Sequence, residues 1–226
     1  MEGSGPVEAV GDGRGFAEGL LTRATAWRDA VLTHPFVCGL GDGSLPPERY
    51  RLYLRQDYVF LREYARVLAL AVAAAQDPED MAALTALLHA TLHGEMDLHR
   101  AAAAEQGIGA AALERCGPAP FTFTYTSHLL AVARGGTLGE IVAALLPCQW
   151  GYAEIGTALA RRGRPPVPAY AAWVEAYAGA EYQATARWVV DQGRHLDGTP
   201  VDGGQGDGLP GLRRGDLALA PREPGE

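Results

Sequence analysis

Apolar and aromatic residues recur every three or four positions over long stretches of this chain, and this spacing strongly limits its possible folds. The clearest run is Tyr50, Leu54, Leu61, Tyr64 and Leu68. Steps of three and four place side chains on one face of an α-helix, whereas a half-buried strand needs strict alternation. The sequence therefore predicts helices that each bury one face.

Prolines and glycines divide the periodic stretches into six predicted helices. The first stops near His34, because Pro35 disfavours helix in the residue before it, and a glycine-rich turn is expected at 39–43. Thr137 and Glu140 have the spacing of a capping box at the start of the fifth helix. The predicted ranges are about 16–34, 47–76, 77–106, 118 or 120 to 135, 137–163 and 168–195.

Length and composition favour one all-α domain. The 226 residues suffice for one sizeable core, alanine and leucine dominate, and β-branched residues are sparse. We expect a single-domain helical bundle over 14–197, after a flexible N-terminus at 1–13. The stretch 198–226 carries eight glycines and four prolines without helical periodicity, which predicts a disordered tail.

Charge and cysteine content exclude several classes of protein. A formal net charge of −8 argues against a nucleic-acid partner, which needs clustered cations. The sequence shows neither a signal-like N-terminus nor an apolar run long enough to span a bilayer, so we expect a soluble cytoplasmic protein without a membrane partner. Three cysteines at irregular spacing suggest neither a disulfide framework nor a paired metal motif.

Polar residues interrupt the apolar faces of three predicted helices. Asp57 lies in the stripe of the second helix, Glu95 in that of the third, and Cys148 with Tyr152 in that of the fifth. Burying a polar group costs free energy unless a partner or a function compensates. These positions are therefore the first candidates for a functional site.

Each candidate also has a structural interpretation. Cys148 could be a small buried hydrophobe, although Pro147 inside the same helix suggests that local geometry matters there. Asp57 could pair with a cation or hold the nitrogens of a ligand. For Glu95 a structural role is favoured, because His99 lies one turn further along the same helix.

Aromatic residues near these positions have two interpretations as well. Tyr125, Trp150, Tyr152 and Tyr177 would by default belong to the core. A planar heteroaromatic ligand would use the same side chains as stacking walls. The residues alone leave both interpretations open.

Several ordered blocks of the chain resemble the thiaminase II (TenA-type) family, over about residues 16–195. The blocks are His34–Pro46, Tyr53–Tyr58, Tyr125–His128, Leu145–Tyr152 and Trp173–Tyr177. Agreement in both order and spacing makes chance similarity a poor explanation.

The resemblance implies a haem-oxygenase-like helical bundle, a homotetramer, and an enzyme without metal or other cofactor. Such enzymes hydrolyse 4-amino-5-aminomethyl-2-methylpyrimidine to hydroxymethylpyrimidine in thiamin salvage, and many also cleave thiamin. By the resemblance, Cys148 is the nucleophile and Asp57 binds the amino edge of the ring. Tyr125, Tyr152 and Tyr177 line the pocket.

The chain departs from the family pattern in two places. Phe60 stands where many members have a tyrosine, and it can stack on a ligand but cannot donate a hydrogen bond. The family also ends in a helix whose glutamate acts as acid and base, and 198–226 predicts no such helix. Three explanations stay open: a truncated or frame-disturbed chain, substitution by Glu95 or Glu181, or a protein that binds pyrimidines without turnover.

A metal-dependent oxidase of the same architecture is the rival enzyme class. It needs several histidine and carboxylate ligands from different helices, and Glu95 with His99 could begin such a set. The predicted helix 168–195 offers Glu175, Glu181 and Asp191 but no histidine within its body. The sequence therefore favours the hydrolase over the oxidase.

Overall fold

A computed structural model describes residues 24–195, and the regular elements in this part of the chain are all helical. The elements are α2 (Thr25–Leu32), α3 (Pro35–Asp42), α4 (Pro47–Ala74), α5 (Pro78–Ala90), the π-helical turn η1 (Thr91–Glu95), α6 (Met96–Glu105), α7 (Ala110–Glu114), α8 (Pro120–Gly135), α9 (Leu138–Arg162), α10 (Pro168–Ala178) and α11 (Ala180–His195). The all-α prediction is confirmed. The predicted soft ends, 1–13 and 198–226, and the expected absence of a final helix lie outside the described residues.

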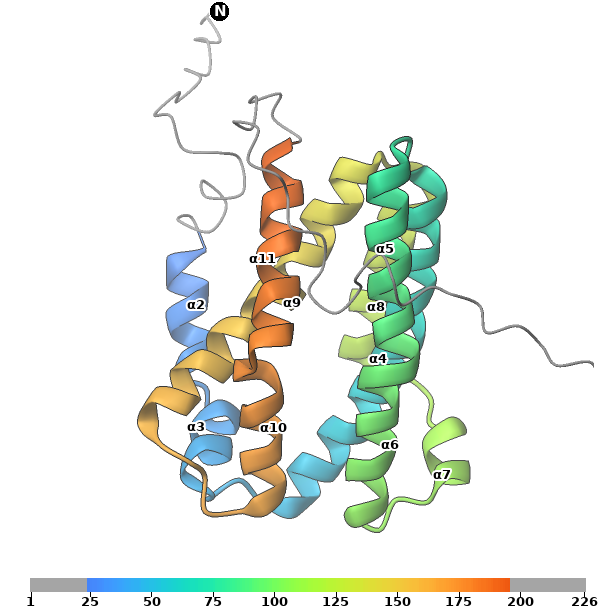
Figure 1. The fold of residues 1–226 in the computed structure, drawn as a ribbon. Helices are drawn as coiled ribbons and strands as arrows, with labels where there is room; N and C mark the ends of the chain where they lie inside the picture. The colour runs from blue at the N-terminus through green and yellow to red at the C-terminus, as the bar shows by residue number, and fades with distance from the viewer. Residues whose placement is uncertain (1–23, 196–226) are drawn as a thin grey trace, which may run out of the picture.

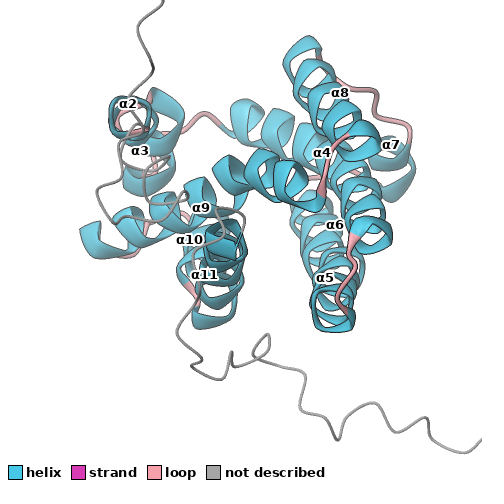
Figure 2. Cartoon of the chain, turned by 90° about the horizontal axis from the view of Figure 1, so that it is seen from above, coloured by secondary structure: helices cyan, strands magenta, loops and turns pink. Residues whose placement is uncertain are grey.

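Helix α9 is the centre of the bundle. It packs against α10 and α11 and, on another side, against α8 and α4. Helix α4 packs in turn against α5, α6 and α8, so that the helices form the two groups seen in Figure 2. One group contains α9, α10 and α11, and the other contains α4, α5, α6 and α8. Their side chains meet where α9 packs against α4 and α8.

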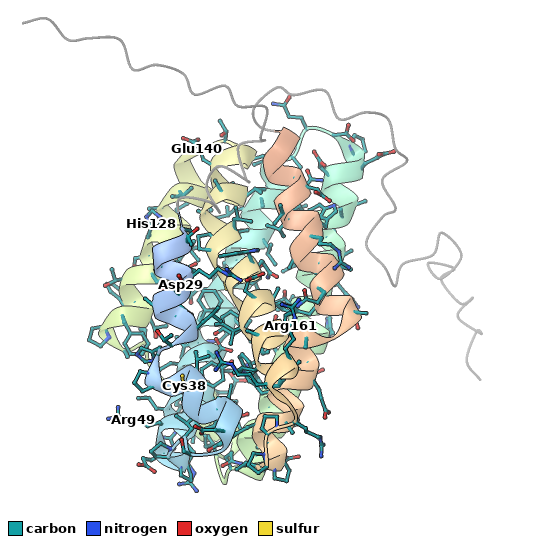
Figure 3. All side chains as sticks on the ribbon, turned by 90° about the vertical axis from the view of Figure 1, so that its left-hand side faces the viewer. Asp29, Cys38, Arg49, His128, Glu140 and Arg161 are labelled. Atoms are coloured by element: carbon teal, nitrogen blue, oxygen red, sulfur yellow. The ribbon has the colours of Figure 1, made fainter. Side chains whose placement is uncertain are left out.

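The start of α9 follows the sequence prediction. Thr137 and Glu140 form the expected capping box, with the Glu140 carboxylate accepting from the Thr137 backbone N–H at 2.7 Å. Figure 3 shows Glu140 and Arg161 near the two ends of this helix. The long helix carries Pro147 in its interior, one residue before the candidate nucleophile.

The glycine-rich turn predicted at 39–43 is wrong for most of its length, because residues 35–42 form α3. Pro35 ends one helix but also starts the next, with the His34 ring accepting from the Phe36 N–H at 3.2 Å. Only Gly43, with φ +83°, has the left-handed backbone of a turn. The proline signal for a helix start outweighed the glycine signal for a turn.

Two predicted helices are interrupted. The third contains η1, where Thr91–Glu95 wind as a π-helix, and the sixth is divided at Gly179 into α10 and α11. The backbone of Gly179 is extended, with φ −63° and ψ 148°. Among the described helices, none has both the length and the apolar character needed to cross a lipid bilayer.

A close approach of α9 and α10 depends on Gly156. A Cβ atom there would lie 2.6 Å from the Tyr177 carbonyl carbon, whereas one at Gly151 would lie 3.4 Å from the Trp27 ring. We expect Gly156→Ala to lower the free energy of unfolding by about 1–3 kcal/mol and Gly151→Ala to leave it unchanged or slightly raised. Thermal unfolding of both variants checks this, and equal melting temperatures would contradict the close approach.

Candidate active site

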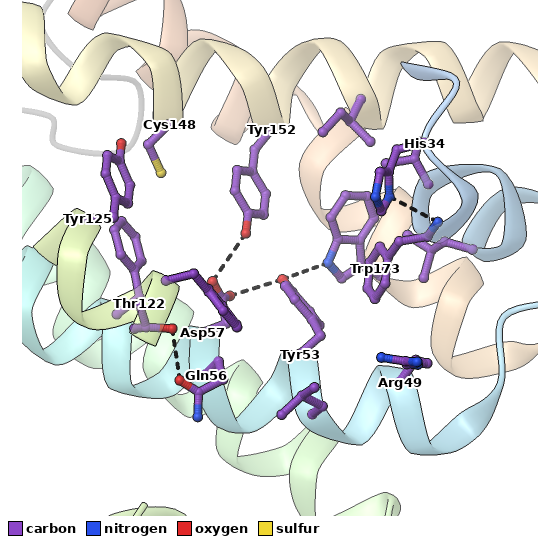
Figure 4. Close-up of a pocket in the computed structure, with 17 residues that line it drawn as sticks. His34, Arg49, Tyr53, Gln56, Asp57, Thr122, Tyr125, Cys148, Tyr152 and Trp173 are labelled. Atoms are coloured by element: carbon purple, nitrogen blue, oxygen red, sulfur yellow. Dashed lines mark hydrogen bonds between the residues drawn. The ribbon is translucent and has the colours of Figure 1, made fainter. Parts of the chain in front are cut away.

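A cavity of about 530 Å³ lies between α4, α8, α9 and α10, and α3 lines it as well (Figure 4). Five of the six residues predicted from the sequence line it: Asp57, Phe60, Tyr125, Cys148 and Tyr152. They come from α4, α8 and α9, which are separate in sequence. The fold therefore brings a thiol, a carboxylate and aromatic rings to one cavity.

The Asp57 carboxylate is fixed by three hydrogen bonds. Its Oδ2 accepts from the Tyr53 hydroxyl at 2.9 Å and lies 2.5 Å from Nε2 of His99, while Oδ1 accepts from the Tyr152 hydroxyl at 3.2 Å. Trp173 holds Tyr53 in turn, because its indole N–H donates to that hydroxyl at 2.9 Å. Asp57 is only 8 % exposed, so this network replaces the water that the carboxylate loses on burial.

His99 lies between two acceptors. Its Nε2 faces Asp57, and its Nδ1 lies 3.1 Å from the backbone carbonyl oxygen of Glu95. Both of these oxygens act as acceptors, so the arrangement favours a ring that carries a proton on each nitrogen. Burial lowers the pKa of His99, but the charge and hydrogen bond of Asp57 outweigh it and raise the pKa above 6.5.

Glu95 follows a different pattern from the one expected. His99 contacts its backbone rather than its carboxylate, and Oε1 accepts from the Tyr177 hydroxyl at 3.2 Å. Glu95 is the last residue of η1. Burial, helped by the nearby charge of Asp57, raises its pKa to about 7. A carboxyl group with this pKa can both accept and release a proton near neutrality.

The Cys148 sulfur points into the cavity toward Asp57 (Figure 4). The thiol is free, and burial together with the negative charges of Asp57 and Glu95 raises its pKa well above 9. At neutral pH the group is therefore a thiol rather than a thiolate. A nucleophilic attack by Cys148 requires a base that removes its proton during the reaction.

Aromatic rings form the walls of the cavity. The rings of Phe60 and Tyr125 stack with an interplanar angle of 2° and 5.7 Å between their centroids. The ring centroids of Tyr152 and Trp173 are 6.0 Å apart. Tyr177 is not among the lining residues. It lies behind Tyr152 and Trp173, with ring centroids 4.8 Å and 4.5 Å away, and its hydroxyl donates to Glu95.

The lining residues that were not selected from the sequence include four polar or aromatic ones that hydrogen-bond within the site: Tyr53, Gln56, Thr122 and Trp173. Tyr53 had a detectable signal, because it precedes Asp57 by one helical turn. Gln56 and Thr122 had none, since their contact joins α4 to α8, with the Thr122 hydroxyl donating to Gln56 Oε1 at 2.8 Å. Such contacts depend on how helices pack.

The ligand set that the oxidase alternative needs is not assembled in residues 24–195, where no three histidine, cysteine or acidic side chains lie together in a metal-binding arrangement. Instead of facing a metal position together with Glu95, the His99 ring binds Asp57. The described residues thus favour acid, base and thiol chemistry.

Comparisons with known proteins agree with this arrangement. Residues 21–196 match the sequence model of the TENA/THI-4/PQQC family. The chain is 43% identical to the aminopyrimidine aminohydrolase of Halalkalibacterium halodurans over 178 residues, which are 77% of this chain and 79% of that protein. It is 35% identical to the aminopyrimidine aminohydrolase of Bacillus subtilis, over 73% of this chain and 69% of that protein.

Solved structures show the same fold. A protein described as a TenA family transcription regulator from Silicibacter sp. superposes with a TM-score of 0.75 at 34% identity, over 80% of each chain. The TenA homologue from P. horikoshii also superposes with a TM-score of 0.75, at 28% identity, over 79% of this chain and 84% of that one. The names of these similar proteins describe an enzyme in two cases and a transcription regulator in another. The chemistry of the cavity is therefore what has to be tested.

Proposed function

The chain belongs to the TENA/THI-4/PQQC family, and from this membership we propose that it is an aminopyrimidine aminohydrolase. Its substrate is 4-amino-5-aminomethyl-2-methylpyrimidine, which it converts with water to the hydroxymethylpyrimidine and ammonia. The observation that carries this proposal is the placement of the Cys148 thiol and the Asp57 carboxylate in one aromatic-walled cavity.

Asp57 binds the amino edge of the substrate ring. A carboxylate offers about four acceptor positions, and three are used by Tyr53, His99 and Tyr152. The remaining position is on Oδ1, which among residues 24–195 accepts only from Tyr152. An amino N–H of a bound pyrimidine would donate to this fourth position. The Asp57 carboxylate is thus held in place by three donors and can still accept from one more.

The walls fit a flat heteroaromatic ring. Phe60 and Tyr125 present stacked faces, and their parallel arrangement favours a planar ligand over a saturated one. Phe60 contributes stacking without a hydrogen bond, so orientation within the cavity rests on Asp57 and the hydroxyl groups.

Cys148 supplies the covalent step. Its sulfur bonds to a ring carbon as a base takes the thiol proton, and the adjacent ring nitrogen takes up a proton, which ends the aromaticity of the ring. The adduct then expels the side-chain amine as ammonia and leaves an exocyclic methylene. Water adds to that methylene, and loss of the thiol restores the aromatic ring. Covalent addition thus replaces one difficult displacement by several easier steps.

The direct test is release of ammonia and hydroxymethylpyrimidine from the aminomethyl substrate by the purified wild-type chain. We expect the two products in equal amounts, with Cys148→Ala, purified in the same way, as the control for contaminating activity. Binding of the pyrimidine without either product would refute the hydrolase and indicate a non-catalytic binding or regulatory protein. Thiamin assayed in parallel decides whether it is a second substrate.

Two further features come from the sequence analysis: a homotetramer from the family resemblance, and a cytoplasmic location from the N-terminal sequence and the lack of a long apolar run. The homotetramer and the cytoplasmic location both stay predictions. The group that acts as acid and base on the ring nitrogen is a separate question, since the region that would carry the glutamate of the family lies outside residues 24–195.

A further inference from the structure

A second, much smaller cavity adjoins the first. It shares Asp57, Phe60, Cys148 and Tyr152 with the large cavity, and we call it the rear cavity. Its other lining residues are Leu61, Tyr64, Glu95, Gln149 and Tyr182. Its volume of about 10 Å³ corresponds to the space that a single water molecule needs.

The rear cavity contains an unpartnered buried polar group. Gln149 is 3 % exposed, its Nε2 donates to the Tyr64 hydroxyl at 2.5 Å, and its Oε1 has no partner among the described residues. If the amide is rotated so that Oε1 faces Tyr64, Nε2 becomes the unpartnered atom instead. In both orientations one end of a buried amide is available to a water molecule in this cavity.

Glu95 is the second polar partner in the rear cavity. Tyr177 occupies its Oε1, and no described residue hydrogen-bonds its Oε2. Cys148, the third, has its thiol on the border between the two cavities. Three polar groups around a water-sized space match the number of hydrogen bonds that a buried water usually makes.

On the premise of the proposed hydrolase, we propose that the rear cavity holds one water molecule bound by Gln149, and that Glu95 takes the proton of the Cys148 thiol through it. The thiol proton passes to the water as a water proton passes to Glu95 Oε2. The sulfur electron pair then forms the bond to the ring carbon, the ring C=N π bond breaks, and its electron pair takes up a proton at the adjacent ring nitrogen. When the thiol leaves, the same protons return, so the water and Glu95 are regenerated.

A purely electrostatic role for Glu95 and a proton relay predict opposite changes in the reactivity of the Cys148 thiol when Glu95 is removed. Its negative charge helps to raise the pKa of Cys148, so removing that charge would by itself make the thiol more acidic and more reactive. A proton relay predicts that removing Glu95 makes the thiol less reactive. The sign of the change therefore separates the two roles.

Kinetics of the aminohydrolase provide the first readout. We expect Glu95→Gln to lower kcat/KM by about 10²-fold or more, and Gln149→Leu to lower it by a smaller factor without altering any charge. Glu105→Gln is the matched control, since Glu105 is an exposed residue of α6 that lines neither cavity. Wild-type activity in Glu95→Gln would overturn the proposal.

The second readout needs no turnover, so it separates this proposal from the proposed function. The alkylation rate of Cys148 by iodoacetamide, followed by mass spectrometry of its peptide, should rise through a shoulder near pH 7 and rise again above pH 9. The groups facing Glu95 are Asp57 and Tyr64 on α4, His99 on α6, Cys148 and Tyr152 on α9, Tyr177 on α10, and Tyr182 on α11.

We expect the shoulder to disappear in Glu95→Gln and to shrink in Gln149→Leu, with thermal unfolding confirming that both variants are folded. A wild type without the shoulder, or faster alkylation of Glu95→Gln near neutral pH, would overturn the relay. If the shoulder depends on Glu95 but no ammonia is released, the relay holds and the proposed hydrolase is wrong.

Discussion

Replacing Cys148 by alanine is expected to lower kcat for the aminomethylpyrimidine by about 10⁴-fold or more while leaving ligand binding nearly unchanged. In the described part of the chain no other thiol can substitute, because Cys38 and Cys116 line neither cavity. The residues that would hold the ring, Asp57 and the aromatic walls, keep their contacts. Steady-state kinetics and a titration of the pyrimidine against intrinsic fluorescence measure the two effects.

Cys116→Ala is the matched control for this variant. The Cys116 sulfur accepts from Gln56 Nε2 at 3.6 Å, outside the cavity, so the same chemical change should leave turnover close to that of the wild type. If Cys148→Ala kept turnover within about tenfold of the wild type, Cys148 could not be the nucleophile. Loss of binding in the same variant would instead assign the thiol a role in holding the ligand.

The helical nature of the chain and five of the residues that line the cavity could be predicted from the sequence. Asp57 and Cys148 interrupt apolar stripes, and a stripe reports which side of a helix is buried. Burial on the inner face is also what a cavity between helices requires. The same periodicity that predicts the fold therefore predicts which polar residues face a site.

The partners of these residues could not be predicted, because they depend on the arrangement of helices. His99 was assigned to Glu95 by its spacing of four within one helix, yet its ring binds Asp57 across α4 and α6. The π-helical turn η1 lies between α5 and α6 and changes the direction in which Glu95 and later residues point. A spacing rule for regular α-helices cannot detect this change.

Tyr177 shows a related limit. Its place in a block that resembles the TenA-type family made it a candidate for the cavity wall, but it lies one layer behind Tyr152. Helical periodicity distinguishes inner from outer faces without giving the depth of a residue. The depth matters here, because it changes Tyr177 from a ligand contact into a residue that positions Glu95.

A variant that breaks the Asp57–His99 pair is expected to lose both activity and stability. Asp57→Asn should lower kcat/KM by about 10²-fold, since a charged acceptor for the ring amino group becomes a neutral one. It should also destabilise the fold, because His99 loses the anion that compensates for its burial. Breaking a buried ion pair by removing one partner costs about 3–5 kcal/mol when the other partner stays charged.

The pH dependence of this loss identifies its cause. In the wild type the pKa of His99 is raised, so its contribution to stability is fully present below about pH 6.5 and is lost as the pH rises through its folded pKa. Without Asp57, burial dominates and lowers the pKa of His99, and the variant loses stability as the pH falls below 6.5. The difference between the two proteins should therefore be larger at about pH 5.5 than at about pH 8.

Urea unfolding of the wild type and Asp57→Asn at these two pH values measures the difference. Glu95 contributes a fall in stability with rising pH in both proteins, because burial is the main cause of its raised pKa, and this effect largely cancels in the comparison. His99→Gln removes the titrating ring and should give a loss that varies less with pH. Equal losses for Asp57→Asn at both pH values would mean that His99 is neutral, and Asp57 would then face the substrate as an uncompensated carboxylate.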